Sequence, residues 1–386
     1  MQYTKLKNIN KYKSENINPA KTPDTVFEMY SVPIYETGHP EYLRGSQIAS
    51  NKAVVEKNDI LVCKINPRIN RVWIVSDESD NLNIASSEWI VVRNNEYNPE
   101  FLAWYFRTPR FQKLMTSEVT GIGGSLTRAQ PKSVAEYPVP VLDRNTQNEI
   151  VARLNKCKII IDSKEQELEQ LDTLVKSRFV ELFGNVFLNT MKWEEHSLEL
   201  IADIVSGITK GRKMKQQTLM EVPYMAVSNV KDGYIDWTTI KTIEATEQEI
   251  NQYRLLPNDV LMTEGGDPDK VGRGAIIRKP LENCIHQNHI FRVRLNTTYI
   301  LPEFFAEYLQ HQRAKRYFLR CAKQTTGIAS INMKQLRALP VLIPPIELQN
   351  QFADFVVSTD KSKSKIQKSL EETQLLFDSL MQKYFG

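Results

Sequence analysis

The chain has 386 residues, of which 41% are apolar and 25% are charged, and its formal net charge is +4. This length predicts two or three domains, and the mildly basic charge permits nucleic-acid binding without proving it. No run approaches the roughly 18 apolar residues of a membrane span, and the N-terminus lacks a signal peptide's apolar segment. The four cysteines form no CxxC pair, which favours reduced thiols and a cytoplasmic location.

The first half of the chain predicts a mixed α/β domain that is followed by one long helix. Short apolar runs between polar turns predict strands at residues 53–55, 60–63, 72–75 and 88–93. A helix should begin at Pro99, because proline favours the first helical turn. Residues 146–183 contain no glycine or proline, and their apolar positions alternate in steps of four and three, with Lys164 and Arg178 as two polar interruptions. This spacing predicts a long helix with a coiled-coil-like seam.

The second half repeats this order of elements. Strands are expected at residues 259–262, 274–277 and 290–293, then a helix from Pro302, and a second long helix over 347–384. Two such helices in one chain most simply pack on each other. The four parts are predicted to be residues 1–144, 145–184, 185–345 and 346–386.

Short motifs confirm that the second half is a copy of the first. Asn58-Asp59-Ile60-Leu61 returns as Asn258-Asp259-Val260-Leu261, and the final Phe385-Gly386 repeats Phe183-Gly184. The period of about 200 residues is far longer than a solenoid repeat. The chain is therefore predicted to be a duplicated domain, which suits a partner with quasi-two-fold symmetry such as duplex DNA.

The sequence lacks the motifs of common catalytic sites. There is no P-loop, GxSxG elbow or HExxH motif, and the acidic run 264–270 is better explained as a turn. Cys284, His286 and His289 do not share a strand face, so a zinc site is not expected. The glycine-rich run 121–125 lacks the strand-to-helix context of a nucleotide site. We expect no enzyme activity, metal site or cofactor in this chain.

The loops of both halves are rich in side chains that contact phosphates and base edges. These loops differ in sequence between the halves whereas the framework agrees, which favours two readers of different short sequences. The candidate DNA-binding residues are Lys64, Asn66, Arg68, Asn70, Arg71, Ser125, Arg128, Lys210, Arg212, Lys213, Ser228, Asn229, Lys270, Arg273, Gln287, Asn288, Ser330 and Asn332.

The seams of the long helices are the candidate docking surface for another subunit. Each seam has more apolar positions than one partner helix would cover, so packing within the chain and docking are both expected. The candidate docking residues are Ile150, Leu154, Ile161, Leu168, Leu171, Val175, Phe352, Val356, Ile366, Leu370, Phe377 and Leu380.

Several motifs together give the chain a family resemblance. They are LPNDVL at 256–261, EGGDPDKVGRG at 264–274, LPVLIPPIELQ at 339–349, SLMQKYFG at 379–386 and IADIVSG at 201–207. With these motifs, in this order and duplicated, the chain resembles the specificity subunit of type I restriction–modification systems. The resemblance covers nearly the whole chain, but residues 1–30 lack a clear counterpart of the opening at 193–207.

The resemblance implies a fold and a set of partners. The fold would be α+β, with two similar mixed α/β target-recognition domains joined by two long antiparallel helices in a pseudo-two-fold repeat. Each domain would read one half of a bipartite double-stranded DNA site. The helices would hold two modification (methyltransferase) subunits, which bind S-adenosylmethionine and methylate adenine, and through them the restriction subunits.

Two other functions stay open at this stage. One is the specificity subunit of a related, type II-like restriction system that cuts near its site. The other is a helical adaptor that joins proteins and never touches DNA. A stand-alone methyltransferase would need an Asn/Asp-Pro-Pro-aromatic motif, which the sequence lacks.

Overall fold

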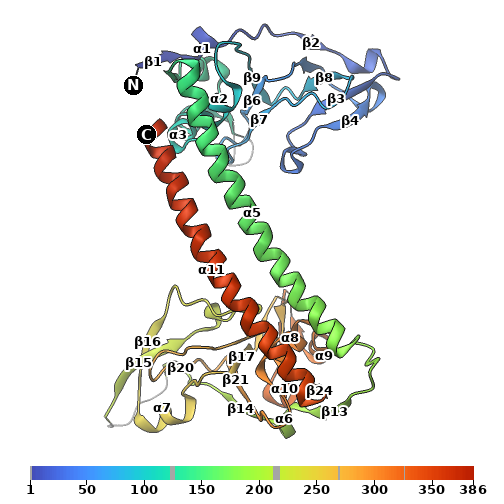
Figure 1. Cartoon of the computed structure of the whole chain (residues 1–386), viewed down its shortest axis with the longest axis vertical. Helices are drawn as coiled ribbons and strands as arrows, with labels where there is room; N and C mark the ends of the chain where they lie inside the picture. The colour runs from blue at the N-terminus through green and yellow to red at the C-terminus, as the bar shows by residue number, and fades with distance from the viewer. Residues whose placement is uncertain (1, 122–126, 212–217, 268–269, 326) are drawn as a thin grey trace. The chain divides into compact units, whose positions relative to one another are not determined.

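The computed structural model describes residues 2–121, 127–211, 218–267, 270–325 and 327–386 (Figure 1). The chain forms two compact units. Unit 1 comprises Met1–Glu165 with Lys368–Gly386, and unit 2 comprises Gln166–Gln367. The long helices α5 (Arg144–Phe183) and α11 (Ile346–Phe385) each contribute one segment to each unit.

Unit 1 contains a central antiparallel sheet and a second, larger sheet. The central order is β7-β6-β9, formed by Val72–Ile74, Ile60–Cys63 and Trp89–Val92. The second order is β2-β5-β8-β3-β4, formed by Asn16–Ile17, Lys52–Val54, Leu82–Ala85, Val26–Tyr30 and Glu41–Arg44. Helices α2 (Pro99–Phe106) and α3 (Pro109–Ser117) follow the central sheet, and Asn98 caps α2.

Unit 2 repeats the central sheet with one strand more. Its order is β14-β21-β17-β19, formed by Ala202–Ser206, Ile290–Leu295, Val260–Thr263 and Gly274–Ile276. A second sheet has the order β16-β15-β20, formed by Lys241–Ala245, Met220–Met225 and Ile285–His286. Helices α7 (Glu247–Tyr253), α8 (Pro302–Gln310) and α9 (Gln312–Cys321) complete this part of the unit.

The opening of unit 1 has a structural counterpart in unit 2, although its sequence does not reveal it. Strand β1 (Gln2–Lys5) pairs antiparallel with β12 (Pro138–Val141) and leads into α1 (Leu6–Ile9). In unit 2, β13 (Glu194–Ser197) pairs with β24 (Pro340–Ile343) and leads into α6 (Leu198–Ile201). The sequence leaves the entry strand of unit 1 uncertain, and the structure identifies it as β1, which pairs through its backbone as β13 does in unit 2.

A buried ion pair explains why Asn-Asp recurs before a central strand of each unit. Asp59 is 1% exposed, accepts two hydrogen bonds from Arg93 at 2.6 and 2.7 Å, and accepts one from the amide of Glu56. In unit 2, Asp259 makes the same contacts with Arg294 and the amide of Leu256. The preceding residues Asn58 and Asn258 both have φ of 71°, a left-handed conformation that asparagine tolerates well.

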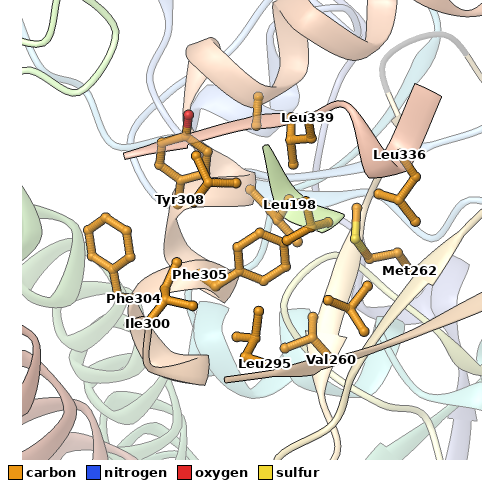
Figure 2. Packing of buried hydrophobic residues seen from close by; sticks show 14 of the residues in the cluster. Leu198, Val260, Met262, Leu295, Ile300, Phe304, Phe305, Tyr308, Leu336 and Leu339 are labelled. Carbon is orange, nitrogen blue, oxygen red and sulfur yellow. The ribbon is translucent and has the colours of Figure 1, made fainter. Parts of the chain in front are cut away.

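Each unit buries the ends of both long helices in its own core. In unit 1, Phe385 packs on Phe101 and Tyr105 with ring centroids 5.4 and 5.9 Å apart. In unit 2, Phe183 packs on Phe304 and Phe352, beside the residues shown in Figure 2. The C-terminal end of the chain therefore completes the core of unit 1.

Within each unit the two helix segments run antiparallel, as the family resemblance implied. In unit 1, Arg153 donates to Tyr384 and Lys164 donates to Ser369. In unit 2, Phe183 contacts Phe352 and Lys363 pairs with Asp172. Contacts that advance along one helix and retreat along the other define an antiparallel pair, and the α+β fold class is confirmed.

Candidate nucleic-acid interface

In unit 1, the loop of residues 64–71 between β6 and β7 is held against residues 127–129. The amide of Asn66 donates to the carbonyl of Thr127 at 2.8 Å, and the amide of Ala129 donates to the carbonyl of Lys64 at 2.9 Å. These bonds bring together Lys64, Asn66 and Arg128, three of the candidate DNA-binding residues.

Glu88 organises this part of unit 1, although the sequence analysis did not single it out. Its carbonyl accepts from the amide of Lys64 at 3.0 Å. Its carboxylate accepts from Nη2 and Nε of Arg128 at 3.0 and 3.1 Å. These hydrogen bonds raise the pKa of Arg128 further, so the guanidinium is a fixed and oriented cation.

The other candidates of unit 1 have different surroundings. Arg68 is exposed, and its carbonyl accepts from Gln112 at 2.6 Å. The Asn70 amide donates to the Phe106 carbonyl at 3.2 Å, which ties the loop to α2. Arg71 is half-buried, and Ser125 lies outside the described residues.

In unit 2, the equivalent loop is part of a small three-stranded sheet. Strand β18 (Gly265–Gly266) pairs with β23 (Ile328–Ser330), which pairs with β22 (Lys323–Thr325). The amide of Ile331 donates to the carbonyl of Glu264 at 2.8 Å, and the amide of Glu264 donates to the carbonyl of His289 at 3.0 Å. Ser330 therefore lies beside the loop that carries Lys270 and Arg273.

Further backbone bonds connect this loop to the remaining candidates of unit 2. The amide of Asn288 donates to the carbonyl of Ile208, and the amide of Ile208 donates to the carbonyl of His286. The exposed Lys210 follows this contact by two residues. Gln287 accepts from the amide of Val227 at 3.4 Å, which brings in the exposed Ser228. Arg212 and Lys213 lie outside the described residues.

Lys270 and Arg273 have contrasting surroundings in the loop. Lys270 is about half exposed and pairs with Asp267, and this contact lowers the pKa of the Asp267 carboxyl. The Nε atom of Arg273 is buried and has no hydrogen-bond partner among the described residues. A buried donor without a partner costs about 1–3 kcal/mol, which is consistent with a ligand that completes it.

Two candidate residues have structural roles that compete with base reading. Asn229 is 3% exposed, and its amide nitrogen donates to the carbonyls of Asp236 and Thr239. Asn332 is the N-cap of α10 (Met333–Arg337) and accepts from the amide of Gln335 at 3.0 Å. Asn229 therefore closes its own loop, and its side chain is buried in this structure.

Most candidate docking residues on the long helices face the chain itself. Ile150, Leu154, Phe377 and Leu380 belong to the core of unit 1 or pack against it. Val175, Phe352 and Val356 do the same in unit 2. Ile161 is also buried, and the remaining four, Leu168, Leu171, Ile366 and Leu370, are half-buried.

A different set of apolar residues on these helices is exposed to solvent. Leu174 and Leu376 are 49% and 53% exposed and occupy equivalent positions of the duplication. The other large exposed apolar residues of the two helices are Ile159, Val180, Val357 and Leu375. The apolar spacing in the sequence points to the seam instead, and each unit uses the seam for its own packing.

The candidate zinc ligands are occupied by other contacts. The ring nitrogens of His286 lie 3.0 and 3.3 Å from the carbonyl oxygens of Tyr253 and Val205, and burial lowers the pKa of His286 to about 4. His289 contacts Glu264 instead. Among the described residues, no three His, Cys, Asp or Glu side chains cluster as metal ligands. No helix in this part of the chain combines the length and apolar character needed to cross a bilayer.

The chain is similar in sequence to known specificity subunits. Residues 191–373 match the family described as Type I restriction modification DNA specificity domain. The EcoKI specificity subunit of Escherichia coli K12 is 23% identical over 301 residues, which cover 74% of this chain and 64% of that protein. The putative MjaX specificity subunit of Methanocaldococcus jannaschii is 29% identical over 195 residues, or 50% of this chain and 45% of that protein.

The fold is also similar to a solved structure. The crystal structure of a type I system S subunit from M. genitalium matches with a TM-score of 0.61 and 14% identity, over 100% of this chain and 96% of that one. This likeness concerns the fold alone. The resemblance inferred from the sequence motifs is confirmed by the family match and the curated relatives. The chain spans about two thirds or less of the length of the two relatives described above.

Proposed function

We propose that this chain, as a member of the family of type I restriction–modification specificity subunits, is the DNA-recognition subunit of such a complex. Unit 1 and unit 2 would each read one half of a bipartite double-stranded DNA site. Catalysis would belong to the partners, with S-adenosylmethionine bound by the modification subunits. This chain would position the complex on the DNA and select the sequence that is modified.

The observation that carries this proposal is the contrast between a repeated backbone and divergent side chains. The loop that follows β6 in unit 1 and β17 in unit 2 is bonded to the same two neighbouring segments in both units. The polar residues at these places nevertheless differ: unit 1 has the half-buried Lys64 and Arg128, and unit 2 has the exposed Lys270 and the half-buried Ser330. A common frame with different polar side chains is suited to reading two different short sequences.

The double variant Lys270→Ala/Arg273→Ala tests the reading role of unit 2. Loss of two cations that contact DNA should weaken specific binding by the assembled complex about tenfold or more, and should reduce its salt dependence. The matched control is Lys361→Ala/Lys365→Ala, which removes the same charge from exposed positions of α11. Unchanged affinity and salt dependence would remove these two residues from the interface. If the complex with wild-type chain fails to retain DNA, the helical adaptor becomes the better explanation.

We also propose that the long helices hold two modification subunits, and through them the restriction subunits. The equivalent exposed leucines, Leu174 and Leu376, support two similar docking surfaces, one on the unit 2 segment of α5 and one on the unit 1 segment of α11. Burial of a leucine side chain contributes about 1.5–3 kcal/mol, so each would be a substantial part of an interface.

The docking role is tested by Leu174→Glu and Leu376→Glu, singly and together. Each single variant should lose one bound modification subunit in native mass spectrometry, and the double variant should lose both. Ser163→Glu, also at an exposed position of α5, is the control. Truncation after Pro344 should also abolish assembly, but it removes Phe352 and Phe385 from the two cores. Full assembly of the double variant would contradict this docking surface.

A further inference from the structure

One backbone junction occurs identically in both units. In unit 1, the amide of Lys64 donates to the carbonyl of Glu88 at 3.0 Å, and the carbonyl of Lys64 accepts from Ala129 at 2.9 Å. In unit 2, Glu264 takes the place of Lys64. Its backbone amide donates to the carbonyl of His289 at 3.0 Å, and its carbonyl accepts from the amide of Ile331 at 2.8 Å. We call these sites the reading junctions.

The side chains at the two reading junctions have opposite charge. Lys64, Glu88 and Arg128 give the unit 1 junction a net charge of +1. The equivalent residues Glu264, His289 and Ser330 give the unit 2 junction a charge of −1 when the imidazole is neutral. Arg128 and Ser330 correspond because each directly precedes the residue that donates to the loop carbonyl.

Both junctions are accessible to a ligand. The side chains of Arg128 and Glu88 are 40% and 26% exposed, and those of His289 and Glu264 are 57% and 33% exposed. None of these four residues belongs to a hydrophobic core. The contrast in charge is therefore presented at the surface.

The chemistry of the unit 1 junction suits an acceptor on the DNA. The Glu88 carboxylate holds the guanidinium of Arg128 by its Nε and Nη2 atoms, which fixes the plane of the fork. An arginine side chain offers hydrogen-bond donors only. In the major groove, guanine O6 and N7 are the acceptor pair that an arginine recognises best.

The chemistry of the unit 2 junction suits a donor on the DNA. The Nδ1 atom of His289 faces the carboxylate of Glu264, which favours the tautomer that carries its proton on Nδ1. The Nε2 atom of this tautomer is an acceptor, as are the carboxylate oxygens. In the major groove, the donors are the exocyclic amino groups of adenine N6 and cytosine N4. Ser330 is small, so this junction lacks the arginine that fills the other.

From this contrast we infer that the two reading junctions are specificity-determining positions with opposite base preference. Lys64, Glu88 and Arg128 select a guanine in one half-site, and Glu264 and His289 select a base with an exocyclic amino group in the other. This inference rests on the proposed function and adds the residues that make the two half-sites different.

The decisive experiment exchanges the side chains while keeping the backbone. The variant Glu264→Lys/His289→Glu/Ser330→Arg gives unit 2 the side chains of unit 1. It is assembled with the modification subunits, and methylation is measured over a library of DNA sites. We expect one half-site to lose its amino-bearing base in favour of guanine, with a change in discrimination of about 5- to 150-fold, while the other half-site stays the same.

The reciprocal variant Lys64→Glu/Glu88→His/Arg128→Ser provides the matched test. It should alter only the half-site that the first variant leaves unchanged. Glu264→Gln, which removes the charge with almost no change of shape, should weaken discrimination at the same base as the unit 2 exchange. Glu199→Gln, at an exposed position of α6, should leave the methylated sequence unchanged.

The outcomes separate this inference from the proposed function. Folded complexes that methylate the original site with unchanged discrimination in all three junction variants would overturn the inference and leave the proposed function intact. A wild-type complex that methylates no bipartite site would overturn the proposed function itself.

Discussion

The central sheets of the two units and the sheets attached to them have diverged to very different extents. The central sheets share the pairing of their strands and the buried aspartate–arginine pair. Each unit also has a buried glutamine, Gln147 or Gln349, that accepts from the backbone just before α2 or α8 at 2.8 Å. Among the residues that the structure describes, the attached sheet has five strands in unit 1 and three in unit 2. The two central sheets therefore share their buried polar contacts. The attached sheets are where the two units differ.

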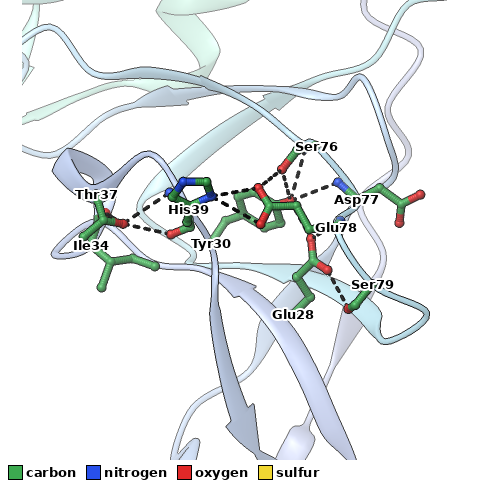
Figure 3. A network of polar contacts seen from close by, with 9 residues as sticks. All are labelled: Glu28, Tyr30, Ile34, Thr37, His39, Ser76, Asp77, Glu78 and Ser79. Atoms are coloured by element: carbon green, nitrogen blue, oxygen red, sulfur yellow. Dashed lines mark hydrogen bonds and ion pairs between the residues drawn. The ribbon is translucent and has the colours of Figure 1, made fainter.

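The interiors of the attached sheets show how deep that difference goes. Each contains one parallel pairing, with Tyr30 opposite Ala85 in unit 1 and Met225 opposite His286 in unit 2. In unit 1, the fully buried carboxylate of Glu28 accepts hydrogen bonds from Tyr30 and Ser79 at 2.7 Å (Figure 3). In unit 2, the buried polar group is the His286 imidazole. The attached sheets therefore bury unrelated polar groups, and they do so on strands that do not correspond.

The largest expected effects concern the aromatic residue that ends each long helix. Phe385→Ala should destabilise unit 1, and the equivalent Phe183→Ala should destabilise unit 2, each by about 3–5 kcal/mol, because each opens a cavity in a packed aromatic core. Hydrogen-exchange mass spectrometry can assign the loss to one unit. Leu375→Ala, at a position 72% exposed, is the control and should change stability by no more than about 0.5 kcal/mol.

Loss of protection in unit 2 on mutation of Phe385 would contradict this assignment. It would mean that the two units unfold together through the long helices. Loss confined to unit 1 would instead show that the last residues of the chain stabilise the first unit alone.

The buried aspartates should give the next largest effects, and these should be equal. Asp59→Asn and Asp259→Asn each remove the charge that neutralises an arginine, and disturb a backbone hydrogen bond. Because both arginines are partly exposed, water screens the loss, and we expect about 2–3 kcal/mol for each. Chemical denaturation of the two variants measures this. A difference above about 1 kcal/mol would show that the two frames are not energetically equivalent.

The parts of the fold that the sequence predicts are those with strong local signals. The central strands other than β14 follow from apolar runs bounded by turns, helices α2 and α8 from Pro99 and Pro302, and the long helices from their spacing. Strand β1 and most strands of the attached sheets were missed. They are held by backbone pairing to distant segments, and strands such as β2 and β20 are only two residues long.

The candidate site shows a different limit of sequence reasoning. Asn229 and Asn332 were selected because amides can read adenine, but an amide also closes loops and caps helices with the same hydrogen bonds. Glu88 and His289, which we propose as specificity-determining residues, do not stand out in the sequence, because a search for DNA-binding side chains favours cations and amides. Each accepts, through its backbone carbonyl, a hydrogen bond from the residue that follows a central strand, and only the folded chain reveals this contact.

Acid should destabilise unit 2 more than unit 1, and this effect should be smaller than those of the substitutions above. The pKa of His286 is lowered by burial to about 4, whereas an unfolded histidine titrates near 6.5. The unfolded chain therefore binds this proton first as the pH falls, and stability that is present above about pH 6.5 is lost towards pH 4. Between pH 7 and 5 unit 2 should lose up to about 2 kcal/mol through this group. Ala85, the equivalent residue in unit 1, cannot titrate.

Hydrogen exchange of both units as a function of pH tests this window. His286→Gln removes the titrating group and should flatten the dependence in unit 2, whatever its effect on stability at pH 7. An unchanged slope in that variant would assign the acid sensitivity to other groups. His39→Gln, at an exposed position of unit 1, is the control.

The smallest predicted effect distinguishes capping from base reading at one pair of equivalent residues. Asn332 caps α10, whereas Gln130, its counterpart in unit 1, makes no capping hydrogen bond to α4 (Pro131–Val134). Asn332→Ala should therefore cost about 1 kcal/mol of stability, and Gln130→Ala about 0.5 kcal/mol or less. Asn332→Ser keeps a capping oxygen but loses the amide, so it should restore stability. If the serine variant is stable yet changes the methylated sequence, Asn332 reads a base as well; if that sequence is also unchanged, its role is the cap alone.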